Sequence, residues 1–251
     1  MRETIYTIPV NEGFEANDEC PFCAMDRSEE QRAIRYYVGP GASYMEPDVR
    51  ASTDRAGFCS GHMKKLYDYG NTLGNALILQ TYYAGLLEEL EAELSDYEIC
   101  AKPGLFSRKK TRSADHSYPE RLQARVNSCA ICEKVEYNME RYYSTFFVLL
   151  KDEKFREKVA SCKGFCLRHF SRLLQETETQ LPESQRQWFQ DTILPLMKDN
   201  MVRVKEELDW LVAKYDYRNA DKPWGNSQDA LPRAMQKLQG IHPADPIFRE
   251  K

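Results

Sequence analysis

The sequence predicts an all-α protein built from two similar halves, and three observations support this prediction. A pattern of potential metal ligands occurs twice, long stretches carry apolar residues at helical spacing, and strand signals are scarce. The Asn-Gly and Asp-Gly turns that typically join β-strands into hairpins are missing. We therefore expect helices throughout both halves.

The repeated pattern is a Cys-x-x-Cys pair followed by a Gly-Phe-Cys-x-x-His segment. The first copy is Cys20, Cys23, Cys59 and His62, and the second is Cys129, Cys132, Cys166 and His169. The pairs are 35 residues apart in the first copy and 33 in the second, which indicates an internal duplication. Structural zinc takes four tetrahedral Cys or His ligands, usually as close pairs. The pattern predicts two closed zinc sites and no catalytic residue.

Core packing and disulfide bonding account less well for these cysteines. Buried cysteine is common in cores, but core packing does not produce the paired spacing. A disulfide framework is typical of small secreted proteins, whereas 251 residues can bury a large core and the N-terminus lacks an apolar signal segment. We expect a cytoplasmic protein in a reducing compartment, and no stretch has the roughly 20 apolar residues of a membrane span.

The first helix of each half is expected to begin at its Cys-x-x-Cys. These helices cover about 21–38 and 130–150, and Gly39-Pro40-Gly41 ends the first. A second helix is expected to begin at each Cys-x-x-His, so that a quartet forms where two helix N-termini meet and the helix dipoles favour thiolate. Quartets closed within each half are the direct interpretation, although ligands exchanged between the halves fit the spacing equally well.

Apolar residues at heptad spacing follow each Cys-x-x-His. In the first half, the heptad predicts one long helix over about 60–97. In the second half, apolar spacing continues over 194–215 after a break at Leu181-Pro182, and Pro195 either kinks or starts that helix. We interpret these stripes as core seams between helices, with a partner groove or self-association as the alternative, so a monomer and a homodimer both stay open.

The duplication divides the chain into a first metal-binding helical repeat (1–100), a linker (101–118), a second repeat (119–216) and a C-terminal tail (217–251). The linker is rich in Pro, Gly, Ser and basic residues. In the tail, Asp229 is a candidate cap for a short helix ending at Gly240, and Trp224 lies between Pro and Gly on a loop suited to docking on the body or on a partner.

The overall charge gives no field that would attract nucleic acid, because 35 basic residues are balanced by 39 acidic ones. Any nucleic-acid or phosphate contact would therefore be local. The candidate is the basic cluster Arg108, Lys109, Lys110 and Arg112, for which a solvated loop is the simpler interpretation.

Two cysteines lie outside the quartets, and neither has a counterpart in the other half. Cys162 precedes the expected ligand Cys166 by four residues, so it is a candidate exchangeable thiol, and Cys100 is a second. A buried, small apolar residue is the simpler interpretation of both.

The chain resembles the DUF6062 family, proteins of unknown function found mainly in anaerobic Firmicutes. The resemblance rests on motifs spread over nearly the whole chain: Thr7-Ile8-Pro9-Val10, Glu19-Cys20-Pro21-Phe22-Cys23, the segment 45–50, Gly57-Phe58-Cys59 with His62, Cys129 and Cys132, Gly164-Phe165-Cys166 with His169, and the tail from Tyr217 to Gly225. It implies a cytoplasmic bacterial protein and brings no activity with it.

The favoured hypothesis is a zinc-stabilised, non-catalytic interaction module that carries two Zn²⁺ ions and binds a protein partner. A thiol-based redox or metal sensor, which releases zinc or oxidises Cys162 or Cys100, is the alternative. An iron–sulfur protein is a further one, although a His ligand is less usual there than four cysteines.

Overall fold

The computed structural model describes residues 5–95, 118–246 and 248–249, and within these ranges the chain is helical with no β-strand. The all-α prediction is confirmed. The helices are α1 (Thr7–Glu15), α2 (Pro21–Val38), η1 (Ser43–Met45), α3 (Pro47–Ala56), α4 (Ser60–Tyr69), α5 (Thr72–Ser95), α6 (Tyr118–Asn127), α7 (Ala130–Leu149), α8 (Glu153–Ser161), α9 (Leu167–Gln180), α10 (Glu183–Ala213), η2 (Tyr217–Asn219), η3 (Gly225–Ser227) and α11 (Ala230–Gln239).

The chain divides into two compact units, each assembled from separate stretches of sequence. Unit 1 comprises Met1–Glu30 and Val135–Pro246, and unit 2 comprises Gln31–Lys134 and Ile247–Lys251. The boundaries fall inside α2 and α7. Each unit therefore takes residues from both of the halves expected from the sequence.

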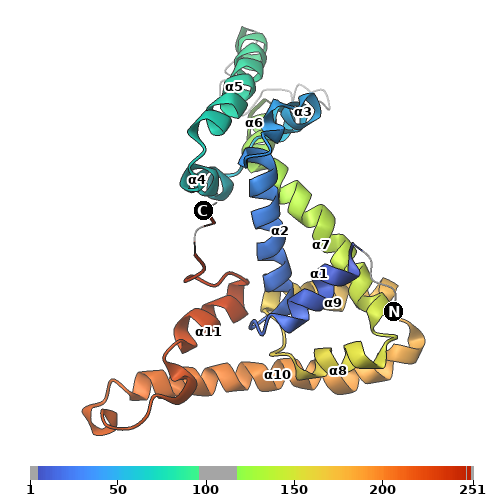
Figure 1. The fold of residues 1–251 in the computed structure, drawn as a ribbon, viewed down its shortest axis with the longest axis vertical. Helices are drawn as coiled ribbons and strands as arrows, with labels where there is room; N and C mark the ends of the chain where they lie inside the picture. Colours follow the sequence, from blue (N-terminus) through green and yellow to red (C-terminus); the bar gives the residue numbers. More distant parts are fainter. Residues whose placement is uncertain (1–4, 96–117, 247, 250–251) are drawn as a thin grey trace, which may run out of the picture. The chain divides into compact units, whose positions relative to one another are not determined.

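Unit 1 is organised along α10, a helix of 31 residues. Helices α8 and α11 lie along α10, and α11 also packs against α9 (Figure 1). Pro195 lies inside α10 without ending it. The break at Leu181-Pro182 is confirmed, since α9 ends at Gln180 and α10 begins at Glu183.

Aromatic rings fill the core of unit 1. Phe22 from α2 stacks on Tyr143 from α7, with 4.5 Å between the ring centroids. Phe14 from α1 contacts the rings of α2, α7, α8 and the turn before α9, and all the members of this cluster are buried: Phe14, Phe22, Phe146, Phe155 and Phe165. The start of α2 and the turn before α9 are thereby held in one core.

Unit 2 is built around α5, against which α3 and α4 pack. Arg125 of α6 donates to Glu89 of α5 over 2.5 Å and to the Tyr82 hydroxyl over 3.3 Å. Tyr37 near the end of α2 donates to the carbonyl of Ala130 at the start of α7, over 3.4 Å. These contacts place the first turn of α7 beside the end of α2.

The single long helix predicted over 60–97 is wrong, because the chain breaks at Gly70. Gly70 has φ +96°, a left-handed conformation that ends α4 before α5 begins at Thr72. The heptad stripe on α5 is also not a core seam. Four of its large apolar members are more than half exposed, namely Leu73 at 66 %, Tyr83 at 58 %, Leu87 at 55 % and Leu94 at 57 %, and Leu90 is partly exposed.

The predicted starts of the first helices are confirmed, since α2 begins at Pro21 and α7 at Ala130. Each segment that leads to a second ligand pair also contains a short helix, which the apolar spacing did not predict. Helix α3 has Pro47 in its first turn, and the Asp152 carboxylate caps α8 by accepting from the N–H groups of Lys154 and Phe155. Within the described residues, no helix is long and apolar enough to cross a membrane.

Candidate metal centres

The first Cys/His cluster, which we call site 1, forms in unit 1 where α2 and α9 begin. Its members are Cys20, Cys23, Cys166 and His169, all of which are buried. Cys20 directly precedes α2, Cys166 is the N-terminal cap of α9, and Cys23 and His169 lie in the first turns. The Nδ1 atom of His169 lies 3.4, 3.4 and 3.2 Å from the sulfur atoms of Cys20, Cys23 and Cys166.

The second cluster, site 2, forms in unit 2 where α4 and α7 begin. It joins Cys59, His62, Cys129 and Cys132. The Nδ1 atom of His62 lies 3.3, 3.2 and 3.3 Å from the sulfur atoms of Cys59, Cys129 and Cys132. The expectation that two helix N-termini meet at each quartet therefore holds for both sites.

The ligand pairs are nevertheless exchanged between the halves, so the expectation of one quartet closed within each half is wrong. Each Cys-x-x-Cys meets the Cys-x-x-His of the other copy. Helix α2 has 18 residues and is about 27 Å long, whereas the ten residues of α3 span only about 15 Å, too little to lead the chain back along the whole of α2. The backbone N–H of Ala130 then donates to the Gly57 carbonyl over 2.9 Å, which fixes the second pair beside α7 and not beside Cys20.

The distances within each cluster fit one tetrahedral zinc ion. With Zn–S bonds of about 2.3 Å and Zn–N bonds of about 2.0 Å, a regular tetrahedron separates two sulfurs by about 3.8 Å and a sulfur from a nitrogen by about 3.6 Å. The sulfurs of Cys23 and Cys166 are 3.6 Å apart, and those of Cys59 and Cys132 are 3.9 Å apart. The sulfur–nitrogen distances of 3.2–3.4 Å are a few tenths of an ångström shorter than the tetrahedral value, so both clusters could hold a metal ion after a small adjustment.

Without a metal ion, the electrostatics of site 1 favour one thiolate, at Cys166, beside a protonated His169, while the hydrogen bond with Cys166 raises the pKa of Cys23. Hydrogen bonds with Cys20 and Cys23 lower the pKa of Cys166 below its ordinary value. Burial lowers the pKa of His169, but the Asp26 carboxylate and the neighbouring sulfurs outweigh it and raise the pKa to about 11. The Asp26 Oδ2 atom lies 3.7 Å from Nε2, on the opposite side of the ring from the sulfurs. A carboxylate in this place orients a metal-binding histidine.

Site 2 contains one thiol that ionises near neutral pH. Burial raises the pKa of Cys129, but hydrogen bonds with His62 and with the backbone N–H of Cys132 outweigh it and lower the pKa to about 6. Burial and the charge of Cys129 raise the pKa of Cys132, so without a metal ion the thiolate of this site resides on Cys129.

Each second ligand pair follows a Gly-Phe dipeptide whose glycine has a positive φ. Gly57 has φ +55° and Gly164 has φ +76°. The following rings are buried, with Phe58 at 9 % exposure and Phe165 at 0 %. Phe165 lies 6.0 Å from Phe22, between centroids, and so joins the two helix starts of site 1.

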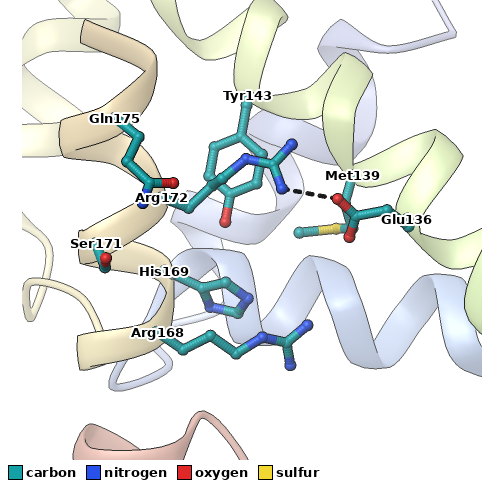
Figure 2. A pocket seen from close by; sticks show the side chains of 8 residues that line it. All are labelled: Glu136, Met139, Tyr143, Arg168, His169, Ser171, Arg172 and Gln175. Atoms are coloured by element: carbon teal, nitrogen blue, oxygen red, sulfur yellow. Dashed lines mark hydrogen bonds and ion pairs between the residues drawn. The ribbon is translucent and has the colours of Figure 1, made fainter. Parts of the chain in front are cut away.

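A pocket of about 220 Å³ borders site 1, and the His169 ring forms part of its wall (Figure 2). Arg172 of α9 donates to Glu136 of α7 over 2.8 Å and to Glu176 over 2.9 Å, and Arg168 pairs with Asp26 over 3.2 Å. The arginines in this wall are thus engaged in ion pairs that join α9 to α7 and α2. The complete lining is Glu136, Met139, Tyr143, Arg168, His169, Ser171, Arg172 and Gln175.

Among the described residues, the remaining candidates belong to neither cluster. Burial raises the pKa of Cys162 to about 11, so its thiol is not activated. Trp224 is 37 % exposed, and the ammonium of Lys214 lies 4.9 Å from its ring centroid. Asp229 precedes α11 but does not cap it, because its carboxylate accepts from Arg233 instead. Cys100, Arg108, Lys109, Lys110 and Arg112 lie outside the described residues.

Sequence reasoning missed the residues that surround site 1. Asp26 belongs to no recognised motif, although it follows Cys23 by three residues and so lies near it on the same helix. The approach of Gly240 at the end of α11 was also missed, because no local pattern indicates it. A Cβ atom on Gly240 would lie 3.3 Å from the Cys166 sulfur and 3.7 Å from the Cys23 sulfur.

Comparisons with known proteins agree with the motifs but add no activity. A family described as "Family of unknown function (DUF6062)" matches residues 1–245. An "Uncharacterized 23.9 kDa protein in xynA 3'region" of Caldicellulosiruptor sp. (strain Rt8B.4) is 25 % identical over 173 residues, which cover 68 % of this chain and 70 % of that protein. No solved structure matches the chain.

Proposed function

Because this chain belongs to the DUF6062 family, whose function is unknown, we propose its role from its own geometry: a zinc-stabilised helical interaction module. Each site holds one Zn²⁺ ion, and the protein carries no catalytic centre of its own. The observation that carries this proposal is the closed set of three sulfurs and one imidazole nitrogen in each cluster.

Closure of both sites supports a structural role for the metal. A catalytic zinc keeps one coordination position for water or substrate and takes three protein ligands, whereas a structural zinc takes four. Both clusters supply four protein ligands at near-tetrahedral spacing. The metal then joins α2 to α9 in unit 1 and α4 to α7 in unit 2.

The surface of α5 supports an interaction role. Its exposed apolar residues recur at heptad spacing, which suits an amphipathic helix of a protein partner or of a second copy. Trp224 is a second candidate contact, and a phosphate or nucleic-acid contact through 108–112 stays a prediction. We place the protein in a reducing cytoplasm, because the described cysteines are free thiols and all but Cys162 belong to a metal-ligand cluster.

Metal analysis of the protein purified without oxygen tests this function. We expect two zinc ions per chain, no visible absorption band, and a large loss of helicity and of melting temperature when a strong chelator removes the metal. Iron with a sulfide absorption band would replace the proposal by the iron–sulfur alternative. A metal-free chain that keeps its melting temperature would contradict a structural role.

A further inference from the structure

The two sites differ in the access that solvent has to their sulfur atoms. At site 1, all four ligand residues are buried. At site 2, His62 and Cys129 are buried, Cys59 is partly exposed and Cys132 is exposed. The chemistry of the ligands is the same at both sites, so the difference lies in the surrounding chain.

Site 1 is covered on several sides. Gly240 of α11 approaches Cys166 and Cys23 closely enough that a methyl group would touch both sulfurs. The rings of Phe22 and Phe165 are fully buried beside the same cluster. Lys237, also buried, donates to the carbonyl of Glu19 next to Cys20 over 2.6 Å. A dissolved oxidant therefore has no direct path to these thiolates.

At site 2, the exposed sulfur has a second thiol within reach. The Cys132 and Cys59 sulfurs lie 3.9 Å apart. The two sulfurs come from the starts of two different helices, α7 and α4. We propose that one metal ion binds both sulfurs and so joins the helices. A disulfide needs the sulfurs about 2 Å apart, so the remaining approach requires that Cys132 first leaves the ion, as it does when its sulfur is oxidised.

We propose that site 2 is a zinc–thiolate reaction centre for peroxides, at which Cys132 is the attacking thiolate and Cys59 the second thiol, while site 1 keeps its metal. This inference rests on the zinc occupancy in the proposed function. It differs from the sensor hypothesis built on Cys162 and Cys100, because the reacting sulfurs here are themselves metal ligands.

The chemistry balances with hydrogen peroxide as the oxidant. The Cys132 thiolate attacks one peroxide oxygen, the O–O bond breaks, hydroxide leaves and takes a proton to become water, and Cys132 becomes a sulfenic acid. The Cys59 thiolate then attacks that sulfur, the S–O bond breaks, and the departing hydroxide takes a second proton. Two thiolates have been oxidised to one disulfide and one peroxide reduced to two waters. Zinc keeps only Cys129 and His62 and dissociates.

The test follows zinc release from the full-length, zinc-loaded protein during treatment with hydrogen peroxide. A chromogenic zinc indicator gives the release rate, and mass spectrometry after alkylation of free thiols gives the disulfides. We expect one zinc per chain to leave at least about tenfold faster than the other, together with a Cys59–Cys132 disulfide. Equal release of both ions, or first oxidation of Cys162 or of a site 1 cysteine, would overturn the inference.

Two matched variants sharpen the test. Cys132→His removes the exposed thiol but keeps a fourth ligand, and Cys23→His makes the same change at the corresponding position of site 1. We expect the fast release to disappear in the first variant and to persist in the second. If Cys132→His fails to fold, the release rates and the disulfides of the unmodified chain still decide the question.

The outcomes separate this inference from the proposed function. A chain whose site 2 holds no zinc before any oxidant is added overturns both, because site 2 then has no zinc–thiolate centre. Two zinc ions that leave at the same rate leave the structural role intact and overturn only the selective chemistry.

Discussion

At both histidines, the ring nitrogen that faces the three sulfur atoms is Nδ1, so Nε2 is left for another partner. At His169 that partner is the carboxylate of Asp26, which lies 3.7 Å away and also pairs with Arg168. Such a carboxylate fixes the tautomer and the orientation of a metal-binding imidazole. The affinity of site 1 should therefore depend on a residue that is not a ligand.

Asp26→Asn should weaken zinc binding at site 1 by about tenfold or more, because the amide cannot polarise Nε2–H as a carboxylate does. Competition with a chelator of known affinity measures this. The control is Arg168→Ala, which removes the 3.2 Å ion pair with Asp26 but leaves the carboxylate beside the ring. Equal weakening by the two variants would mean that only the surface ion pair matters.

Gly240 is a second residue that affects site 1 without being a ligand of the metal. Gly240→Ala places a methyl group 3.3 Å from the Cys166 sulfur at a backbone φ of +84°. A left-handed conformation costs an alanine about 1 kcal/mol, and crowding of the sulfur adds to this. We expect a lower melting temperature and faster loss of one zinc to a chelator.

Gly70→Ala is the matched control for Gly240→Ala. Gly70 has a similar left-handed φ of +96°, but its Cβ would meet nothing within 4 Å. It should therefore lower stability through backbone strain and leave zinc loss at site 1 unchanged. If both variants lost zinc equally fast, the contact with the sulfurs would have no role.

At the scale of the elements, α10 and α11 are tied to the start of α2 through one buried carboxylate. Glu19 is paired with Arg203 of α10 over 2.5 Å, with Arg233 of α11 over 3.5 Å and with Lys237 of α11 over 3.3 Å. Burial raises the pKa of Glu19, but the hydrogen bond from Arg203 and the charge of Lys237 outweigh it and hold the pKa below its usual value. The residue before Cys20 is thereby fixed by two distant helices.

Glu19→Gln should lower the free energy of unfolding by about 3 kcal/mol at neutral pH, since it leaves the buried ammonium of Lys237 without its carboxylate partner. Because the pKa of Glu19 is lowered on folding, its contribution is fully present above the unfolded value of about 4.5 and is lost as the pH falls through the folded value. The free energies of unfolding in urea of the unmodified chain and of Glu19→Gln should therefore become more similar below about pH 4.5.

Glu183→Gln is the control for this prediction. Glu183 is 84 % exposed and pairs with Arg186 over 3.0 Å at the surface of α10. Such a pair contributes about 0 to 1 kcal/mol, so the variant should unfold nearly as the unmodified chain does. If both variants lost a similar amount of unfolding free energy, burial of the ion pairs around Glu19 would add nothing to stability.

At the scale of the whole molecule, the exchanged pairing has a direct test in pairs of alanine variants. Cys20→Ala with Cys166→Ala damages only site 1, whereas Cys20→Ala with Cys59→Ala damages both sites. We expect the first double variant to keep one zinc ion against a strong chelator and the second to keep none. Pairing within each half would give the reverse result.

Local signals in the sequence predicted much of the fold. The starts of α2 and α7 follow from the Cys-x-x-Cys pairs, and the break between α9 and α10 follows from Pro182. The break at Gly70 was missed because the heptad spacing runs across it. The identity of the ligands could be predicted, but their pairing could not, since it depends on the tertiary contact between Gly57 and Ala130.

Because the ligand pairs are exchanged, a single backbone cut between the two halves would divide the ligands of both sites. A backbone cut between residues 95 and 118 yields two fragments, and each carries one pair of ligands for each site. Neither fragment alone can complete a native tetrahedron. The two pieces together would form a split protein whose reassembly requires zinc, and a chelator would then separate them.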